Sequence, residues 1–209
     1  MAERVDAVEL LLNAGAKVLV VFGDMGTSLF SFVFDVKKNM VFRQIMCEKA
    51  YVELLCSTNI NDITLCNLEL GWESVFNSAV FEVDDVGVKM LLCLLFSIAE
   101  KLGILFDVVS RFVTSNYHMY LENAIHMARD ENPRYFNPEE NVKALRNIEM
   151  LLMIGYDRSS AIPNNRGYEY EECVKRKLSP ENAKRILSFH HNITLFELLN
   201  FRLELCSFK

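Results

Sequence analysis

The sequence predicts an all-α fold, organised as an array of helix–turn–helix repeats. Only four prolines and eight glycines occur among 209 residues, so few positions interrupt a helix. Apolar residues recur at helical spacing in at least five segments. Two short patterns also alternate along the chain, as the two helices of a repeating unit do. We therefore expect helix in more than half of the residues and no sheet beyond short turn pairs.

The N-terminal half contains three predicted helices. The first spans residues 5–15, keeps its apolar residues on one side and ends on Gly15, a typical helix C-cap. Residues 49–59 repeat this pattern and end on an asparagine. Residues 88–103 are apolar nearly all round, which predicts a buried helix at the centre of the fold.

The C-terminal half contains three more. Residues 141–157 are apolar at helical spacing, and Gly155 is expected to end this helix in the left-handed conformation. Residues 179–190 open with Ser179 as an N-cap, followed by a proline and a glutamate that favour the first turn. An atypical final helix is expected over residues 194–209.

Two segments are expected to interrupt the helices. Residues 129–141 carry two prolines and a cluster of charges, which predicts an insertion loop within one repeat domain that spans residues 1–209. Residues 17–30, "KVLVVFGDMGTSLF", place an apolar run before two glycines, and Thr27 and Ser28 can then cap a helix. Because many phosphate sites follow the order strand, glycine turn and helix start, this stretch also raises an enzymatic alternative.

Internal similarity supports a repeat. The segments "VELLLNAGAKV" (8–18) and "VELLCSTNIND" (52–62) align without a gap, and "IEMLLMIGYDR" (148–158) shares the double leucine and the glycine. A second pattern alternates with this one, and its copies begin at Gly26, Trp72, Glu122 and Gly167. The alternation indicates two helices in each unit.

These patterns resemble the ankyrin repeat, in which the first helix reads G-x-TPLHxA and the second is close to VxLLLxxGA. Residues 26–30 are similar to the start of the first helix, and residues 124–128 are similar to its LHxA. Residues 8–16 are the closest copy of the second helix. The resemblance is most specific over residues 5–30 and 124–168.

The resemblance implies a degenerate ankyrin-like solenoid. The first-helix pattern recurs roughly every 45–50 residues, so we expect insertions or lengthened helices within the array. On this alignment the chain begins in the second helix of a repeat, and we expect that first helix to be poorly buttressed.

The stretch "VVFGDMGTSL" also resembles the first motif of the haloacid-dehalogenase-like phosphatases, Asp-x-Asp-Gly-Thr. Gly26 and Thr27 match this motif, whereas Gly23 and Met25 stand at the positions of its two carboxylates. Covalent phosphotransfer needs one carboxylate to attack and another to move the proton. A P-loop lysine is missing too, because Thr27 follows the last glycine. We therefore expect that the protein is not an enzyme.

The spacing of the histidines and cysteines predicts neither a metal site nor a nucleophilic site. His118 and His126 are eight residues apart, not the three or four that place two ligands side by side on one helix face, and the adjacent His190 and His191 point in divergent directions. The six cysteines form no CxxC pair, which favours free thiols in a reducing compartment. Cys173 lies near a basic run that can lower its pKa, but the sequence places no base beside it. We expect no cofactor and no metal.

Composition excludes two classes of partner. The net charge is −6, whereas nucleic-acid binding needs a dense basic surface. The charged N-terminus does not read as a secretory signal, and the apolar run 90–99 is much shorter than the ~20 residues of a membrane span. We therefore expect no nucleic acid or membrane partner, and a location in the cytoplasm or the nucleus.

The remaining interpretation is a helical scaffold that binds another protein and no small-molecule ligand. The ankyrin resemblance implies an adaptor or inhibitor that uses its concave face and its turn tips. The expected contact residues are polar and lie at the turns: Lys17, Asp24, Asp157, Asn164, Asn165 and Arg166. The alternative is a non-repeat all-helical domain with a groove for an amphipathic partner helix. An unrecognised enzyme is the third interpretation.

Overall fold

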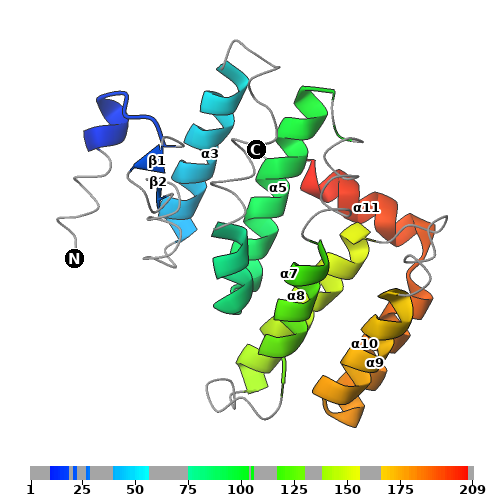
Figure 1. The fold of residues 1–209 in the computed structure, drawn as a ribbon. Helices are drawn as coiled ribbons and strands as arrows, with labels where there is room; N and C mark the ends of the chain where they lie inside the picture. The colour runs from blue at the N-terminus through cyan, green and yellow to red at the C-terminus, as the bar shows by residue number, and fades with distance from the viewer. Residues whose placement is uncertain are drawn as a thin grey trace. The chain divides into compact units, whose positions relative to one another are not determined.

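The computed structural model describes the chain at residues 10–18, 21–22, 27–28, 40–56, 75–103, 105, 117–129, 138–155 and 166–206. Helices dominate these residues, so the predicted all-α class is confirmed (Figure 1). The contacts of the chain gather in two compact units, Met1–Val75 and Phe76–Lys209, and each is described by itself. The expectation of a single repeat domain stays a prediction.

The first described helix ends on Gly15, as predicted. Residues 10–13 are helical, and Gly15 has a left-handed φ of 85°. The Ala16 N–H donates to the Leu11 carbonyl at 2.9 Å, and the Gly15 N–H donates to the Leu12 carbonyl at 3.1 Å. These two bonds form a Schellman motif, which satisfies carbonyls that the end of a helix leaves unpaired.

A short hairpin replaces the helix start that was expected at Thr27 and Ser28. Strand β1 (Val21–Phe22) pairs in antiparallel fashion with β2 (Thr27–Ser28), with Val21 opposite Ser28. The backbone groups of Thr27 and Ser28 therefore bond across the hairpin instead of opening a helix. Among the described residues, Thr27 and Ser28 thus form a strand at the position where a phosphate site would begin its helix.

Helix α3 (Met40–Cys56) begins nine residues before the predicted 49–59 segment and covers its first eight residues. Its earlier start follows the apolar stripe, because Met46, Cys47 and Ala50 are all fully buried. The Val18 N–H donates to a Glu53 carboxylate oxygen at 2.7 Å, which ties the segment after the first helix to α3. The expected asparagine end lies outside the described residues.

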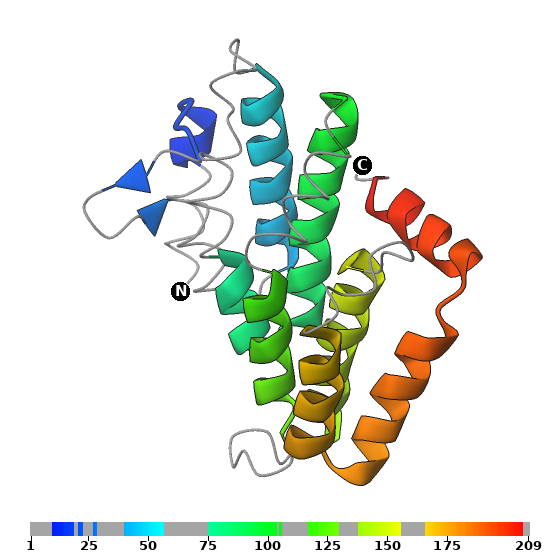
Figure 2. The same cartoon turned by 45° about the vertical axis from the view of Figure 1, so that its right-hand side comes forward.

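The C-terminal unit is a cluster of helices around α8. It contains helical residues 76–81, α5 (Asp85–Lys101), α7 (Tyr117–Met127), α8 (Pro138–Gly155), α9 (Arg166–Lys177), α10 (Pro180–Asn192) and α11 (Leu195–Leu205). Helix α8 contacts α5, α7, α10 and α11. Figures 1 and 2 show α7 alongside α8, and α9 alongside α10.

Helix α5 is the buried helix that the 88–103 segment predicted. Most of its side chains are buried. The Asp84 carboxylate accepts the Gly87 N–H at 3.0 Å and so caps the start of the helix. The chain leaves the helix through Gly103, which has a left-handed φ of 70°. At the other end, just before α5 begins, Val83 has a φ of 55°, which is unusual for a β-branched residue.

The starts of α10 and α11 are also confirmed. Ser179 accepts the Asn182 N–H at 3.3 Å, and Pro180 is the first helical residue of α10. Thr194 and Glu197 form a capping box: the Thr194 hydroxyl accepts the Glu197 N–H at 3.2 Å, and the Glu197 carboxylate accepts the Thr194 N–H at 2.8 Å. Helix α11 ends at Leu205 within the predicted range 194–209, of which 207–209 lie outside the described residues.

The predicted insertion loop 129–141 is wrong at its C-terminal end. Helix α8 already begins at Pro138, so residues 138–141 are helical. Proline suits the first turn because its N–H is not needed there, and Glu139 and Glu140 complement the positive end of the helix dipole. Residues 130–137 lie outside the described residues.

Gly155 ends α8 as predicted, but not in the expected left-handed conformation. Among the described glycines only Gly15 and Gly103 have a positive φ. A Cβ atom on Gly155 would instead overlap the ring of Tyr117 on α7. Glycine is required here because a neighbouring side chain fills the space, and not because of the backbone angle.

The packing of α11 differs from that of a simple stack of repeats. In a solenoid each unit contacts its neighbours in sequence. Helix α11 contacts α5, where the Ser97 hydroxyl donates to the Leu205 carbonyl at 3.1 Å and Lys89 pairs with Glu204 at 2.5 Å. The ankyrin-like arrangement is therefore not confirmed by these contacts.

We predict that Gly155→Ala lowers the free energy of unfolding by about 1–3 kcal/mol, because the new methyl group overpacks against the Tyr117 ring. Gly103→Ala is the control: it meets open space and bears only the cost of a left-handed angle, about 1 kcal/mol. Urea denaturation of both variants measures the difference. An equal or smaller loss for Gly155→Ala would contradict the close contact.

We also predict that amides of residues 10–13 exchange with solvent faster than those of residues 90–98. Leu10 and Leu11 are exposed, whereas the central part of α5 is almost wholly buried. Hydrogen exchange read by mass spectrometry or NMR measures this. Equal protection of the two segments would show that the first helix is covered.

Candidate functional site

The predicted partner-binding residues are mostly beyond what the structure describes. Lys17 is exposed, as a contact residue must be. Arg166 opens α9, but its side chain is outside the described part. The remaining four are outside the described residues: Asp24, Asp157, Asn164 and Asn165. Binding through these residues stays a prediction.

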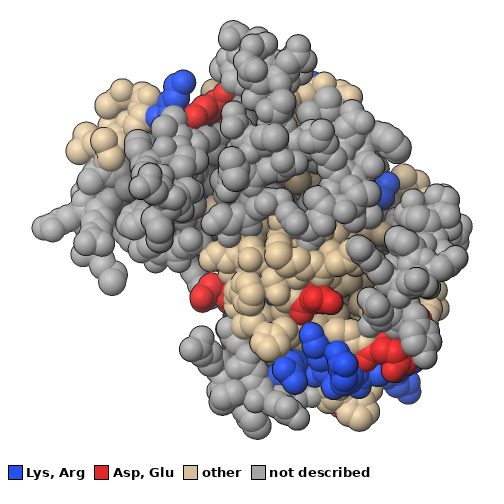
Figure 3. All heavy atoms as spheres, in the orientation of Figure 1, with Lys and Arg blue, Asp and Glu red and all other residues tan. Residues whose placement is uncertain are grey.

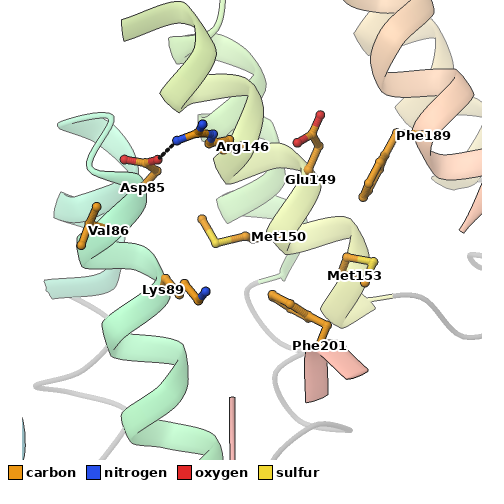
Figure 4. A pocket seen from close by; sticks show the side chains of 9 residues that line it. All are labelled: Asp85, Val86, Lys89, Arg146, Glu149, Met150, Met153, Phe189 and Phe201. Atoms are coloured by element: carbon orange, nitrogen blue, oxygen red, sulfur yellow. Dashed lines mark hydrogen bonds and ion pairs between the residues drawn. The ribbon is translucent and has the colours of Figure 1, made fainter. Parts of the chain in front are cut away.

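The C-terminal unit contains a pocket of about 470 Å³ among α5, α8, α10 and α11, which we call the α8 groove (Figure 4). Its lining side chains come from all four helices: Asp85, Val86, Lys89, Arg146, Glu149, Met150, Met153, Phe189 and Phe201. We call its five apolar members, Val86, Met150, Met153, Phe189 and Phe201, the apolar floor. Figure 4 shows Met150 pointing into the space beside α5, with Phe189 and Phe201 on the other side.

One side of α8 supplies four of these residues. Arg146, Glu149, Met150 and Met153 follow the spacing i, i+3, i+4 and i+7, which places them on a single face. The opposite side carries buried residues such as Ile148, so α8 is apolar on both sides. Methionine fills irregular apolar surfaces and adapts to different partners.

Ion pairs surround this apolar floor. Arg146 pairs with Asp85 at 3.2 Å, and Arg185 pairs with Glu149 at 2.7 Å. The cation is the more exposed partner in both, at 60% against 11% for Arg146 and Asp85, and 43% against 20% for Arg185 and Glu149. In a third pair, between the lining residue Lys89 and Glu204, the carboxylate is instead the more exposed partner, at 54% against 44%. The two arginines are therefore the places where the rim of the α8 groove exposes positive charge.

A second pocket of about 280 Å³ lies between α7 and α9, and we call it the α7–α9 pocket. Its lining mixes apolar and reactive side chains: His118, Met119, Leu121, Glu122, Ile125, Tyr170 and Cys173. The Tyr170 hydroxyl is buried, and no hydrogen-bond partner for it lies among the residues that the structure describes. Burial raises the pKa of Tyr170, so its phenol stays protonated.

His190 packs beside this pocket. Its ring lies edge-to-face against Tyr170, with 5.5 Å between the ring centroids. Burial lowers the pKa of His190, and the neighbouring His191 lowers it further, while Glu171 opposes the shift. The neutral imidazole is therefore the favoured form in the folded protein.

Helix α11 leaves a row of apolar side chains exposed. These are Leu195, Phe196, Leu199 and Leu203. They lie on the side away from the buried Leu198 and Leu205. Nothing in the described structure shows what covers this row.

Basic side chains gather at the end of α9, where Figure 3 shows them over the α9–α10 end of the C-terminal unit. Lys175 lies 3.7 Å from Glu171 and 3.5 Å from Glu172, on the same helix. Cations at a helix C-terminus are favoured by the helix dipole. This arrangement agrees with a solvated helix face.

Several further observations concern expected chemistry. The described cysteines Cys47, Cys93, Cys173 and Cys206 are free thiols. Within the described residues, no group of three histidine, cysteine or carboxylate side chains is placed to hold a metal ion. None of the described helices combines the length and the apolar character needed to cross a membrane.

Comparison of the chain with protein-family models, curated proteins and solved structures finds no match. The resemblance to ankyrin repeats therefore stays a prediction.

Sequence reasoning did not find the two pockets. The "IEMLLMIG" stretch did contain a signal, because apolar residues on both sides of a helix indicate a second contact surface. The residues that complete the α8 groove come from α5, α10 and α11. Each of them lies more than 30 positions from the α8 residues that line the groove, so no local sequence pattern joins them.

We predict that the free energy of unfolding falls as the pH is lowered from about 8 to about 5, and that His190→Gln reduces this fall. The unfolded chain takes up the His190 proton near the ordinary pKa of about 6.5, whereas the folded protein resists it until a lower pH, so acid favours unfolding. Denaturation at several pH values measures the effect. The exposed His126→Gln is the control, and the same reduction in both variants would contradict the assignment.

Proposed function

We propose that this protein is a protein-interaction module that binds an amphipathic helix of a partner protein in the α8 groove. The observation that carries the proposal is an accessible apolar floor, built by four helices, with ion pairs around it. Helix-in-groove recognition uses such surfaces, because anchors spaced i, i+3 or i+4 and i+7 on the partner enter one apolar groove.

The chemistry of the rim supports an acidic partner. Arg146 and Arg185 expose more of their side chains than the carboxylates that they pair with. An approaching helix with Glu or Asp beside its apolar stripe meets complementary charge, which favours encounter and orientation. The expected partner helix is therefore apolar on one face and acidic along the edges of that face.

The side chains on the floor of the α8 groove can adjust their shape to a bound partner. Met150 and Met153 have flexible side chains, and Phe189 and Phe201 supply large apolar area. Aromatic residues and methionine are enriched in the buried cores of protein interfaces. This groove-binding interpretation is the alternative that the sequence left open.

The ankyrin-type interpretation remains a prediction beside it. It places partner contacts at Lys17 and at the turn around residues 157–166, which the structure describes only in part. A cytoplasmic or nuclear location is common to both interpretations and belongs to the proposal.

We predict that Met150→Lys weakens binding of selected helical peptides by at least tenfold, because it places a charge on the apolar floor. The test selects peptides from a displayed library of helix-forming sequences against the wild-type chain and measures their affinity by fluorescence anisotropy. Leu199→Lys is the matched control: it makes the same kind of change on the exposed face of α11, away from the groove. Circular dichroism verifies that both variants fold.

The proposal also predicts acidic residues in the selected peptides, weaker binding at higher salt, and a loss of the acidic preference in Arg146→Glu. Binding that survives Met150→Lys but is lost in Leu199→Lys would place the interface on α11. A selection that enriches no helical peptide would contradict the proposal as well.

A further inference from the structure

Two free thiols lie where helix α11 packs on helix α5. Cys93 is on α5, and Cys206 directly follows the last residue of α11. Both are partly exposed, so a small oxidant can reach them from solvent. Figures 1 and 2 show the C-terminal end of α11 beside α5, in agreement with the contacts between these helices.

Polar contacts on both sides of Cys93 join the two helices. One turn before it, Lys89 pairs with Glu204 at 2.5 Å. One turn after it, the Ser97 hydroxyl donates to the Leu205 carbonyl at 3.1 Å. Residues four positions apart are neighbours on one helix face, so Cys93 lies between these two contacts on the face of α5 that meets α11.

Cys206 is held at the second of these contacts. The Leu205 carbonyl belongs to the peptide group that links Leu205 to Cys206, so its bond to Ser97 keeps the backbone of Cys206 against α5. Cys93 is one turn from Ser97, which is about 6 Å along the helix axis. The Cα atoms of a disulfide are about 4.4–6.8 Å apart, so a small slide of the end of α11 along α5 joins the two thiols.

The charges around the thiols agree with this proximity. Burial is the main cause that raises the pKa of Cys93 to about 11; Lys89 opposes it, whereas Glu204 and Cys206 raise it further. Burial also raises the pKa of Cys206, and Glu100 adds to the effect. Little thiolate therefore forms at neutral pH, so both thiols react slowly and their oxidation needs a sustained supply of oxidant.

We propose that Cys93 and Cys206 are a redox-sensitive pair, which a hydroperoxide converts into a disulfide between α5 and α11. The disulfide fixes the end of α11 to the buried helix α5, and reduction releases it. This inference goes beyond the proposed function and does not depend on the binding of a helix in the α8 groove.

The oxidation is balanced by reduction of the peroxide. One thiolate attacks an oxygen of hydrogen peroxide, the O–O bond breaks, and a sulfenic acid and a hydroxide ion form. The second thiolate attacks the sulfenic sulfur, so that the S–S bond forms, the S–O bond breaks and a second hydroxide leaves. The two thiol protons convert the hydroxides into water. The thiols lose two electrons in total, and the peroxide gains them.

Helix α11 is an element that such a link can stabilise. Among its side chains, only Leu198 and Leu205 are buried, whereas most of the side chains of α5 are buried. A helix with few buried contacts opens locally at a lower free-energy cost than a core helix. A covalent link between residues far apart in the sequence removes conformations of the opened state. Oxidation should therefore slow the opening of α11.

The test treats the full chain with hydrogen peroxide, blocks the remaining thiols with N-ethylmaleimide and identifies linked peptides by mass spectrometry without reduction. We expect the Cys93–Cys206 peptide to be the main disulfide, and dithiothreitol to remove it. Cys93→Ser and Cys206→Ser should each abolish this link. Cys173→Ser is the matched control, because it removes a partly exposed thiol on α9, and it should leave the link unchanged.

Hydrogen exchange then measures the effect on α11. We expect amides of residues 195–205 to exchange about tenfold more slowly in the oxidised wild type than in the reduced one. Oxidised Cys206→Ser should show no such change, which separates the disulfide from other oxidation of the chain. Circular dichroism verifies that the variants fold. A different main disulfide, a Cys93–Cys206 link that forms only in denaturant, or equal exchange of α11 in both forms would each overturn the proposal.

Discussion

The contact between Tyr117 and the end of α8 is the interaction on which the C-terminal unit depends most. The Tyr117 hydroxyl donates to the Leu151 carbonyl at 3.1 Å, and its ring occupies the space that any side chain at position 155 would need. The bond joins residues 34 positions apart, and the glycine allows the ring to lie directly against the backbone. This contact holds α7 on one side of α8. Helix α8 is in turn the element that α5, α10 and α11 contact.

The α8 groove follows from this packing. Since α7 and the buried core occupy one side of α8, the side that carries Arg146, Met150 and Met153 is left for contacts with α5, α10 and α11. Those helices do not fill the space completely, and two ion pairs join α8 to its neighbours: Arg146 pairs with Asp85 on α5, and Glu149 pairs with Arg185 on α10. Exposed ion pairs contribute little to stability. In the function that we propose, their larger role is to arrange charge around an apolar surface that receives a helical partner.

Helix ends were the features that sequence reasoning predicted best, and the failures have physical causes. Gly15, Ser179 and Thr194 act through hydrogen bonds to backbone groups within five residues, so their neighbours in sequence are sufficient to assign them. Thr27 is chemically able to cap a helix but pairs with β1, and Gly155 has the right place for a left-handed cap but serves a contact with α7. Neither partner is visible in the local pattern. The residues of both pockets were missed for the same reason, although the double-sided apolar pattern of α8 pointed to an additional contact surface.

The sequence by itself determined the helical class, the buried character of α5 and the caps that begin α10 and α11, because these depend on periodicity and on bonds between residues a few positions apart. Val83 shows where this reasoning ends: its φ of 55° opposes local preference, and its side chain is nevertheless buried at 1% exposure. Only the tertiary structure decided that α11 packs on α5 through Ser97 and Leu205, 108 residues apart, and that the Tyr117 hydroxyl bonds to the Leu151 carbonyl, 34 residues away. Such contacts depend on which surfaces, far apart in the sequence, become buried against each other. A short-range sequence pattern contains no information about that pairing.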